Sequence, residues 1–404
     1  MSEKRSAATI FVLITVLIDA IGFGVIIPVM PSLISELAHT DTSGAARYGG
    51  FLFAAYSVMQ FICSPVMGGL SDQYGRRPIL LASLFGFGLD YLFLVFAPSI
   101  TWLFVGRLIA GVMGASFTTA AAYMADISTP EKRAQNFGMI GAAFGLGFII
   151  GPSIGAIASH YGTRVPFMVA GILTLCNFLY GYFVLPESLK PENRRKFDWK
   201  RANPIGALIN LRRFPMLIGL VSALFLVYIS SFSTQGTWTY FTKERFGWSD
   251  QEIGWSLSFV GFMIALVQGG LTRILIPKLG TKNAIYVGFG FSIFGALAYT
   301  FADQGWMMYA IMVPYALGGL AGPAMQGIIS TQVPANEQGE LQGSLTSLNS
   351  VAAIIGPVLM TGLFYKFTEK DAPIYFPGVP FLASVILTTI SLLLIIRTLK
   401  KNAH

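Results

Sequence analysis

Charge is scarce in this chain of 404 residues, of which 11% are Asp, Glu, Lys or Arg and 54% are hydrophobic. A soluble domain carries about 25% charged residues, so this composition excludes an ordinary soluble protein. The 2 cysteines lie in apolar runs and indicate no disulfide framework. The 3 histidines lie in loops or at the tail, and the sequence contains no cluster of metal ligands. The net charge of +8 is confined to short loops, which argues against nucleic-acid binding.

Long apolar runs, in contrast, are abundant. Stretches of about 20 residues recur, and each can cross about 30 Å of hydrocarbon. The first run is too long for a signal peptide and lacks a small-residue cleavage site, so we expect it to be retained. We predict an all-α membrane protein with a central cavity and twelve spans in two six-helix bundles. The predicted spans are 8–36, 48–70, 78–97, 100–125, 133–158, 165–185, 214–242, 251–275, 283–302, 305–331, 339–366 and 376–397.

The longest connection, from Pro186 to Phe214, is charged and contains proline, as expected of a linker. We therefore predict an N-terminal bundle at 1–185, a cytoplasmic linker at 186–213 and a C-terminal bundle at 214–404. A weak repeat supports two halves, because Gly138 to Pro152 matches Gly343 to Pro357 at a constant offset of 205. Of the 27 Lys and Arg residues, 20 lie on the linker's side and 6 on the other. The positive-inside rule then predicts a multi-pass inner-membrane protein with both termini in the cytoplasm.

A short charged segment, Gly68 to Pro78, joins spans two and three. Its glycines allow tight backbone geometry, Pro78 suits the first turn of the next helix, and Asp72 can lie near that helix's positive end. A positively charged membrane loop is the simpler interpretation. The ordered pattern Gly-x-x-x-Asp-x-x-Gly-Arg-Arg is more specific and predicts a gating loop. We predict that Asp126, which ends span four, pairs with one of the arginines; a solvated helix-end acid is the alternative. The predicted gating residues are Gly68, Asp72, Gly75, Arg76, Arg77 and Asp126.

Three ionisable side chains lie deep inside predicted spans. Asp19 in span one and Asp90 in span three are near mid-membrane, where a charged acid costs at least about 2.5–3.5 kcal/mol. Such acids are suited to proton exchange, because they are neutral when dry and ionised when wet; the alternative is structural hydrogen bonding to a neighbouring helix. Arg107 in span four stays charged and needs a partner. We predict Asp19 as that partner, with backbone carbonyls of span one or snorkelling to the surface as alternatives.

Small residues and a proline mark span five. Gly147, Gly151, Pro152 and Gly155 are predicted to form a groove for close helix packing and a bend, and packing alone is the alternative to a functional motif. Four polar side chains elsewhere are predicted to line the central cavity and bind substrate, with hydrogen bonding between helices as the alternative. These predicted substrate-binding residues are Gln60, Gln235, Gln326 and Asn349.

Together these motifs resemble those of the major facilitator superfamily. The Gly68–Pro78 segment resembles its loop between helices two and three. The Gly-Arg-Leu-x-x-Gly pattern at Arg107 resembles its helix-four proton-transfer motif, and Gly147-x-x-x-Gly151-Pro152-x-x-Gly155 resembles its helix-five antiporter motif. Tyr56-Ser57-Val58-Met59-Gln60 and Leu89-Asp90-Tyr91 look like the tetracycline/proton antiporter branch. The resemblance implies a transporter rather than an enzyme, one that exports a small, amphipathic, tetracycline-like compound in exchange for protons and confers antibiotic resistance.

The chain departs from that branch in its second half. Tetracycline exporters typically place a third membrane acid in span nine, and some place a histidine in span eight. This chain has Ser292 near the first position and no histidine from Gly261 to Gln268. We therefore expect proton coupling to rest on Asp19, Asp90 and Arg107. A major facilitator symporter or uniporter for an unidentified small solute is the alternative, and the helix-five motif favours export over it.

The rivals from other classes lack support in the sequence. A membrane-embedded enzyme would need a nucleophile with a base, or a metal cluster, and a sensor would need a soluble signalling segment. We expect no cofactor and no metal site, with the proton as the coupling ion. A tetracycline-like substrate would be carried as a magnesium chelate. The expected partners are a small-molecule substrate and the lipid bilayer, without nucleic acid, and we expect the chain to function as a monomer.

Overall fold

The computed structural model describes residues 2–114, 116–128, 130–199, 203, 205–206, 217–332 and 338–401. Within these residues every regular element is a helix and no strand is present, which confirms the predicted all-α class. Eleven of the described helices are long and apolar enough to cross a membrane. Residues 200–202, 204 and 207–213 of the predicted linker lie outside the described part of the chain.

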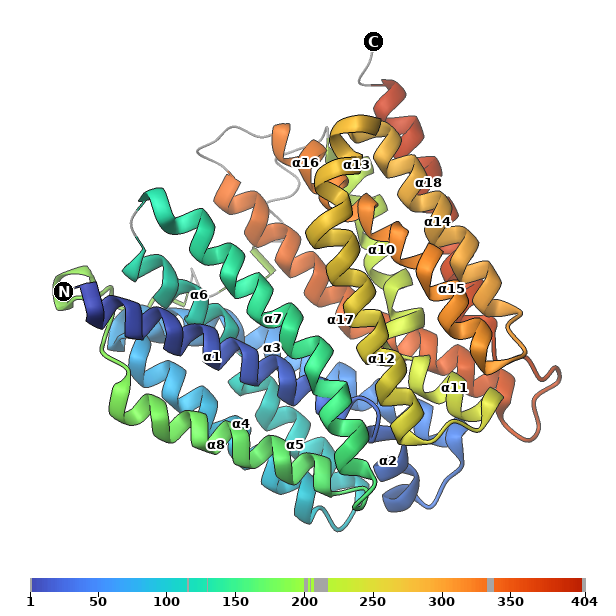
Figure 1. Ribbon diagram of the computed structural model, residues 1–404, viewed down its shortest axis with the longest axis horizontal. Coiled ribbons are helices and arrows are strands. Elements are labelled where there is room, and N and C mark those ends of the chain that lie inside the picture. Colours follow the sequence, from blue (N-terminus) through green and yellow to red (C-terminus); the bar gives the residue numbers. More distant parts are fainter. Residues whose placement is uncertain are drawn as a thin grey trace. The chain divides into compact units, whose positions relative to one another are not determined.

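Two predicted spans of the first half are divided in the structure. The first span ends at Ile26 and a short helix follows from Met30, because Pro28 lacks a backbone N–H and restricts the residue before it. Span four breaks at Gly114 into two helices. The elements up to residue 193 are α1 (Ser2–Ile26), α2 (Met30–Ala38), α3 (Thr42–Tyr74), α4 (Arg76–Phe96), α5 (Ile100–Met113), α6 (Ser116–Ile127), α7 (Pro130–Ser159), α8 (Val165–Val184) and η1 (Pro191–Asn193) (Figure 1).

The second half shows similar interruptions. A π-helical segment, η4, lies within predicted span eight, and a 3-10 turn, η5, lies within span ten. The elements are α10 (Ile218–Gln235), α11 (Trp238–Phe246), α12 (Asp250–Ile264), η4 (Ala265–Leu271), α13 (Thr272–Leu279), α14 (Thr281–Thr300), α15 (Gly305–Leu317), η5 (Gly318–Leu320), α16 (Ala321–Thr331), α17 (Gln338–Thr368) and α18 (Val379–Lys401).

The chain divides into two compact units. Unit 1 comprises Met1–His39, Ala55–Asn203 and Asp250–Ser258, and unit 2 comprises Thr40–Ala54, Pro204–Ser249 and Phe259–His404. The beginning of α3 is therefore grouped with the second half of the chain, and the beginning of α12 with the first. The predicted bundle boundaries at 185 and 214 stay a prediction. A division of the chain at the linker does not anticipate the grouping of Thr40–Ala54 with unit 2 or of Asp250–Ser258 with unit 1.

Close packing of α7 on α1 organises unit 1, and the two helices lie side by side in Figure 1. A Cβ on Gly147 would lie 2.6 Å from the carbonyl oxygen of Leu17, and one on Gly151 would lie 2.6 Å from that of Ile21. The glycine groove therefore faces α1 and lets the two backbones touch, as predicted for span five. Beside this contact, buried side chains from α1, α4, α6 and α7 form an apolar core that includes Phe11, Leu84 and Tyr123.

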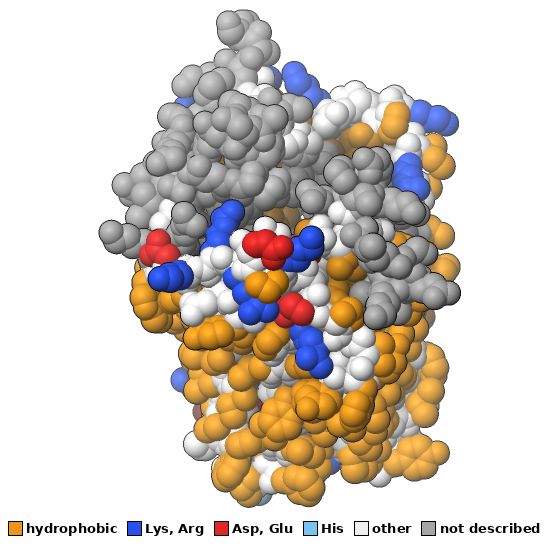
Figure 2. All heavy atoms as spheres, turned by 90° about the vertical axis from the view of Figure 1, so that its left-hand side faces the viewer, with side chains coloured by type: hydrophobic (Ala, Val, Ile, Leu, Met, Phe, Trp, Pro, Cys, Tyr) orange, Lys and Arg blue, Asp and Glu red, His pale blue; other side chains and the backbone are white. Residues whose placement is uncertain are grey.

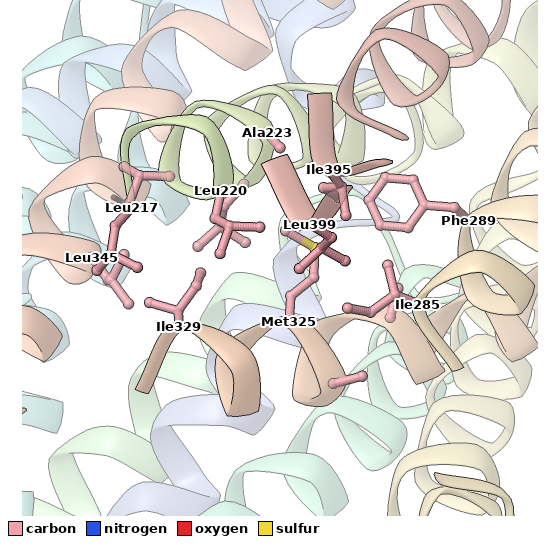
Figure 3. Close-up of a cluster of buried hydrophobic side chains, with 14 of the residues drawn as sticks. Leu217, Leu220, Ala223, Ile285, Phe289, Met325, Ile329, Leu345, Ile395 and Leu399 are labelled. Carbon is pink, nitrogen blue, oxygen red and sulfur yellow. The ribbon is translucent and has the colours of Figure 1, made fainter. Parts of the chain in front are cut away.

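Unit 2 has its own apolar core between α10, α14, α16, α17 and α18. Figure 3 shows Leu220 of α10, Ile285 of α14 and Met325 of α16 directed toward one another, with Ile395 and Leu399 of α18 beside them. Each of these five side chains is 1% exposed or less, apart from Leu399 at 8%. The core holds together helices that are far apart in sequence.

Large apolar side chains also cover much of the outside of the protein. Phe183, Trp306 and Phe301 are among many large hydrophobic residues with exposed side chains. Figure 2 shows hydrophobic side chains over a broad area of one face, with acidic and basic side chains gathered in a patch. An apolar exterior of this kind fits hydrocarbon rather than water, in agreement with the membrane spans.

Candidate functional site

A buried ion pair lies at the centre of the candidate site in unit 1. Asp90 of α4 is 1% exposed, and its Oδ2 accepts a short hydrogen bond from the Nη2 of Arg107 on α5. Gly106 makes the approach possible, because a Cβ there would lie 2.8 Å from Asp90 Oδ1. The structure thus brings two of the three predicted proton-coupling residues into direct contact across the α4–α5 hairpin.

This pairing corrects the prediction for Arg107. Its ion-pair partner is Asp90 and not the predicted Asp19. The contact arises because α5 follows α4 as its antiparallel neighbour, so residues at equal depth on facing sides of this hairpin meet. Asp19 lies on α1, is partly buried and takes part in polar interactions of its own. Snorkelling is also ruled out as the main solution for Arg107, since the residue is 9% exposed.

Two buried tyrosines lie near the three charged groups. The hydroxyls of Tyr56 on α3 and Tyr91 on α4 each lie within electrostatic reach of Asp19, Asp90 and Arg107. Tyr91 reaches α1 because Gly22 leaves room there: a Cβ on Gly22 would lie 2.2 Å from the tyrosine oxygen. The predicted proton-coupling residues therefore form one cluster, with aromatic hydroxyls among the charges.

Gln60, predicted to bind substrate, lies next to this cluster. Its Nε2 donates to the Tyr56 hydroxyl at 3.1 Å and lies 3.4 Å from the carbonyl oxygen of Gly114, where α5 ends. The Gly114 carbonyl can accept this contact because the helix is interrupted at Gly114. Gln60 is partly exposed. The residue thus links α3 to the break in span four, and its role in substrate binding stays a prediction.

The other three predicted substrate-binding residues belong to unit 2. Gln235 is the last residue of α10 and is exposed. Gln326 of α16 is exposed and donates to Gln342 Oε1 at 3.1 Å, and Asn349 of α17 is also exposed. None of the three is in the unit that holds the charged cluster, and their role in binding stays a prediction.

The predicted gating loop is much shorter than the sequence suggested. Helix α3 continues to Tyr74 and α4 begins at Arg76, so Gly75 alone separates them. Gly75 has φ +109°, a conformation that favours glycine. Arg76 connects both helices and α6, since it lies 2.5 Å from Asp72 Oδ1 and 3.2 Å from Asp126 Oδ2. The expected pairing of Asp126 with one of the two arginines is therefore present, and the arginine is Arg76.

Sequence reasoning missed an acid that caps α4. Glu187, just after α8, accepts the backbone N–H of Arg76 at 2.9 Å and that of Arg77 at 3.2 Å. It occupies the helix N-terminus where Asp72 was expected, while Asp72 lies on α3 and faces Arg76. A Cβ on Gly75 would lie 2.2 Å from Glu187 Oε2, which explains the glycine. No sequence signal identifies this contact, because the acid is more than 100 residues away.

The linker is attached to the same place. Gln73 Oε1 accepts the backbone N–H of Phe197 at 2.9 Å, and Arg195 donates its backbone N–H to Asp72 O at 3.1 Å. The Phe197 ring fills the space beside Gly69, where a Cβ would lie 2.8 Å from the ring. The Gln73 side chain thus binds the linker. Gly68 has open space around its Cα, so close packing does not account for it.

Neither Ser292 nor the Gly261–Gln268 segment of the second half contains an acid or a histidine, and polar side chains there contact neighbouring helical segments. Ser292 of α14 lies against η5, because a Cβ on Gly318 would lie 2.2 Å from its Oγ. Gln268 belongs to the π-helical segment η4, and a Cβ on Gly319 would lie 3.6 Å from its Nε2. Both positions are thus engaged in helix packing, which leaves the charged cluster of unit 1 as the candidate for proton coupling.

Comparison with known proteins agrees with this geometry. A model described as Major Facilitator Superfamily matches residues 12–357, and the chain belongs to this family of transporters. Within it, the chain is similar to the tetracycline resistance protein, class C, of Escherichia coli, with 38% identity over 361 residues, 89% of this chain and 90% of that protein. The class B protein of Escherichia coli is 34% identical over 399 residues, 96% of each chain.

Solved structures share the fold. The crystal structure of a bacterial homolog to the human lysosomal transporter Spinster superposes with a TM-score of 0.79, at 15% sequence identity, over 98% of this chain and 97% of that one. At this identity the likeness concerns the fold alone. The expected major facilitator architecture is confirmed, and the protein is a transporter and not an enzyme.

Proposed function

We propose that this protein exports a small, amphipathic, tetracycline-like compound in exchange for protons. The observation that carries the proposal is the cluster of Asp19, Asp90 and Arg107 in one helical unit. With both acids ionised, the three groups carry one net negative charge, which a single proton neutralises. Since Asp90 already balances the charge of Arg107, the partly exposed Asp19 is the group that exchanges this proton.

The similarity to tetracycline resistance proteins supports a drug of this class as substrate. A tetracycline-like substrate carried as a magnesium chelate would bring positive charge to a cluster with one negative charge. Proton and substrate would then compete for that charge, as antiport requires. The absence of an acid at Ser292 supports a coupling mechanism confined to unit 1. We further propose an inner-membrane protein that functions as a monomer in the bilayer, with both termini in the cytoplasm.

Transport into everted membrane vesicles with an imposed pH gradient tests this proposal. Wild-type protein should accumulate tetracycline when the lumen is acidic. Asp19→Asn should abolish gradient-driven accumulation, because the side chain can no longer exchange a proton, while Asp303→Asn, in an exposed loop, should behave as wild type. Undiminished accumulation by Asp19→Asn would remove Asp19 from the mechanism. Accumulation that requires an alkaline lumen would indicate symport instead of antiport.

A further inference from the structure

A cavity of about 400 Å³ lies in unit 2, beside the first turns of α3 and the last turns of α17. Its lining includes Arg47 and Phe51 from α3, and Val358, Tyr365, Lys366 and Glu369 from α17 and the residue after it. The two helices are fastened next to the cavity, because Ser43 Oγ donates to Thr368 Oγ1 at 2.6 Å. The cavity therefore lies beside a hydrogen-bonded contact between α3 and α17, and its lining belongs to unit 2 rather than to the unit of the charged cluster.

The charged and the apolar side chains of this cavity lie at different positions along the helix axes. Arg47, Lys366 and Glu369 lie near the helix ends, whereas Phe51 lies about one turn beyond Arg47 and Val358 about two turns before Lys366. The charged and apolar ends of the α17 side are about 12 Å apart at 1.5 Å per residue. The Arg47 guanidinium lies over the Tyr365 ring, 5.2 Å from its centre, and both Arg47 and Glu369 interact with the tyrosine hydroxyl. Tyrosine at this level is typical of a membrane interface.

Arg47 and Glu369 already interact with Tyr365, and a ligand would share these charged groups with it. Among the described residues, the ion pairs include none of Arg47, Lys366 and Glu369. Arg47 and Lys366 have exposed side chains, and Phe51 is 44% exposed. Two cations and one anion thus surround the polar end, and an apolar wall continues toward the membrane interior.

We propose that this cavity binds a phospholipid with a primary amine in its headgroup, a phosphatidylethanolamine. Arg47 and Lys366 bind the phosphodiester, since guanidinium and ammonium groups are the usual phosphate donors. The Glu369 carboxylate accepts hydrogen bonds from the lipid ammonium, and an acyl chain lies along Phe51 and Val358. A bound lipid would bridge α3 and α17. The inference concerns lipid binding and holds whichever substrate the protein carries.

The order of polar and apolar surfaces favours a lipid over a soluble ligand. A free phosphate would use the cations and leave the apolar wall exposed, whereas a phospholipid covers both ends at the depths where its own headgroup and chain lie. Glu369 selects among lipids, because an ethanolamine headgroup offers N–H donors, a choline headgroup offers none and a glycerol headgroup carries no positive charge.

Native mass spectrometry of the full-length protein in detergent tests the proposal. The protein is incubated with phosphatidylethanolamine, phosphatidylglycerol or phosphatidylcholine of identical acyl chains, and retained lipid is measured. Wild type should retain phosphatidylethanolamine best. Arg47→Gln and, independently, Lys366→Gln should lower its retention about tenfold, as expected for loss of a hydrogen bond between charged groups. Glu369→Gln should abolish the preference over phosphatidylglycerol, and Lys370→Gln, an exposed charge outside the cavity lining, should change nothing.

Several outcomes would overturn the inference. Equal retention of the three lipids by wild type, or an unchanged preference in Glu369→Gln, would mean that Glu369 does not read the headgroup. Displacement of the lipid by equimolar inorganic phosphate or glycerophosphoethanolamine would identify a soluble anion as the ligand. Displacement by tetracycline would make the cavity a substrate site. All variants carry substitutions of exposed or partly exposed side chains, and their unfolding temperatures, measured in parallel, should match wild type.

Discussion

Replacing Asp90 by asparagine tests the contribution of the buried Asp90–Arg107 ion pair to stability. Asp90→Asn keeps the size of the side chain and removes its charge, so Arg107 keeps its positive charge where it is 9% exposed. Removing one partner of a buried ion pair costs about 3–5 kcal/mol, because the other charge is left without compensation. We therefore expect Asp90→Asn to be among the most destabilising single substitutions in unit 1.

We expect the loss of unfolding free energy in Asp90→Asn to lie at the lower end of this range of about 3–5 kcal/mol, which holds for buried ion pairs in general. Among the described residues, Asp90 Oδ1 and Arg107 Nε have no hydrogen-bond partner, so the pair is incompletely satisfied. We expect a loss of about 3 kcal/mol for the single substitution. Replacing both residues, as Asp90→Asn with Arg107→Gln, should restore at least half of this loss, since no unpaired charge remains. The double variant keeps the net charge of the cluster, which then lies on Asp19, so gradient-driven transport by Asp19 should be retained.

Unfolding by sodium dodecyl sulfate in mixed micelles measures these free energies. The two single variants and the double variant form a cycle, and we expect a coupling energy above about 1 kcal/mol. Glu36→Gln is the control, because it breaks an exposed ion pair with Arg164, 3.2 Å long, whose loss should cost at most about 1 kcal/mol. Additive losses in the cycle, or equal losses for Asp90→Asn and Glu36→Gln, would refute the buried pair.

Two further predictions concern helix packing and capping, and thermal unfolding measures both. Glu187→Gln weakens two hydrogen bonds at the N-terminus of α4 and should lower the free energy of unfolding by about 0.5–2 kcal/mol. Its control is Glu192→Gln, an exposed side chain of the linker, which should have no effect. Equal unfolding temperatures for the two variants would disprove the cap. Gly151→Ala places a methyl group against the backbone of α1 and should lower the free energy of unfolding by about 1–3 kcal/mol. Its control is Gly145→Ala in the same helix, where the added methyl group meets open space and the substitution should be neutral or stabilising. If both alanine variants were equally stable, the close α1–α7 contact would be wrong.

The helical fold was predictable because hydrocarbon leaves a chain few choices. Backbone polar groups must be satisfied within each span, so apolar runs of sufficient length become helices. The interruptions were harder to place. Pro28 signals the end of α1, but no comparable local signal marks the break at Gly114 or the π-helical segment Ala265–Leu271. The grouping of Thr40–Ala54 with the second half follows from contacts such as Ser43 to Thr368, which no local pattern encodes.

The sequence by itself identified the charged residues of the candidate coupling site. Asp19, Asp90 and Arg107 stood out because ionisable groups in hydrocarbon are costly, and the glycines of span five stood out by their spacing. Only the tertiary structure decided how these residues are paired. Arg107 could have met any acid at its depth, and the choice of Asp90 depends on how α5 lies against α4. Likewise Glu187 caps α4 from more than 100 residues away. The cost of burying an ionisable side chain depends on the residues along one helix and can be read from the local sequence. The partner of that side chain depends on how separate helices rotate and approach one another, which only the folded chain fixes.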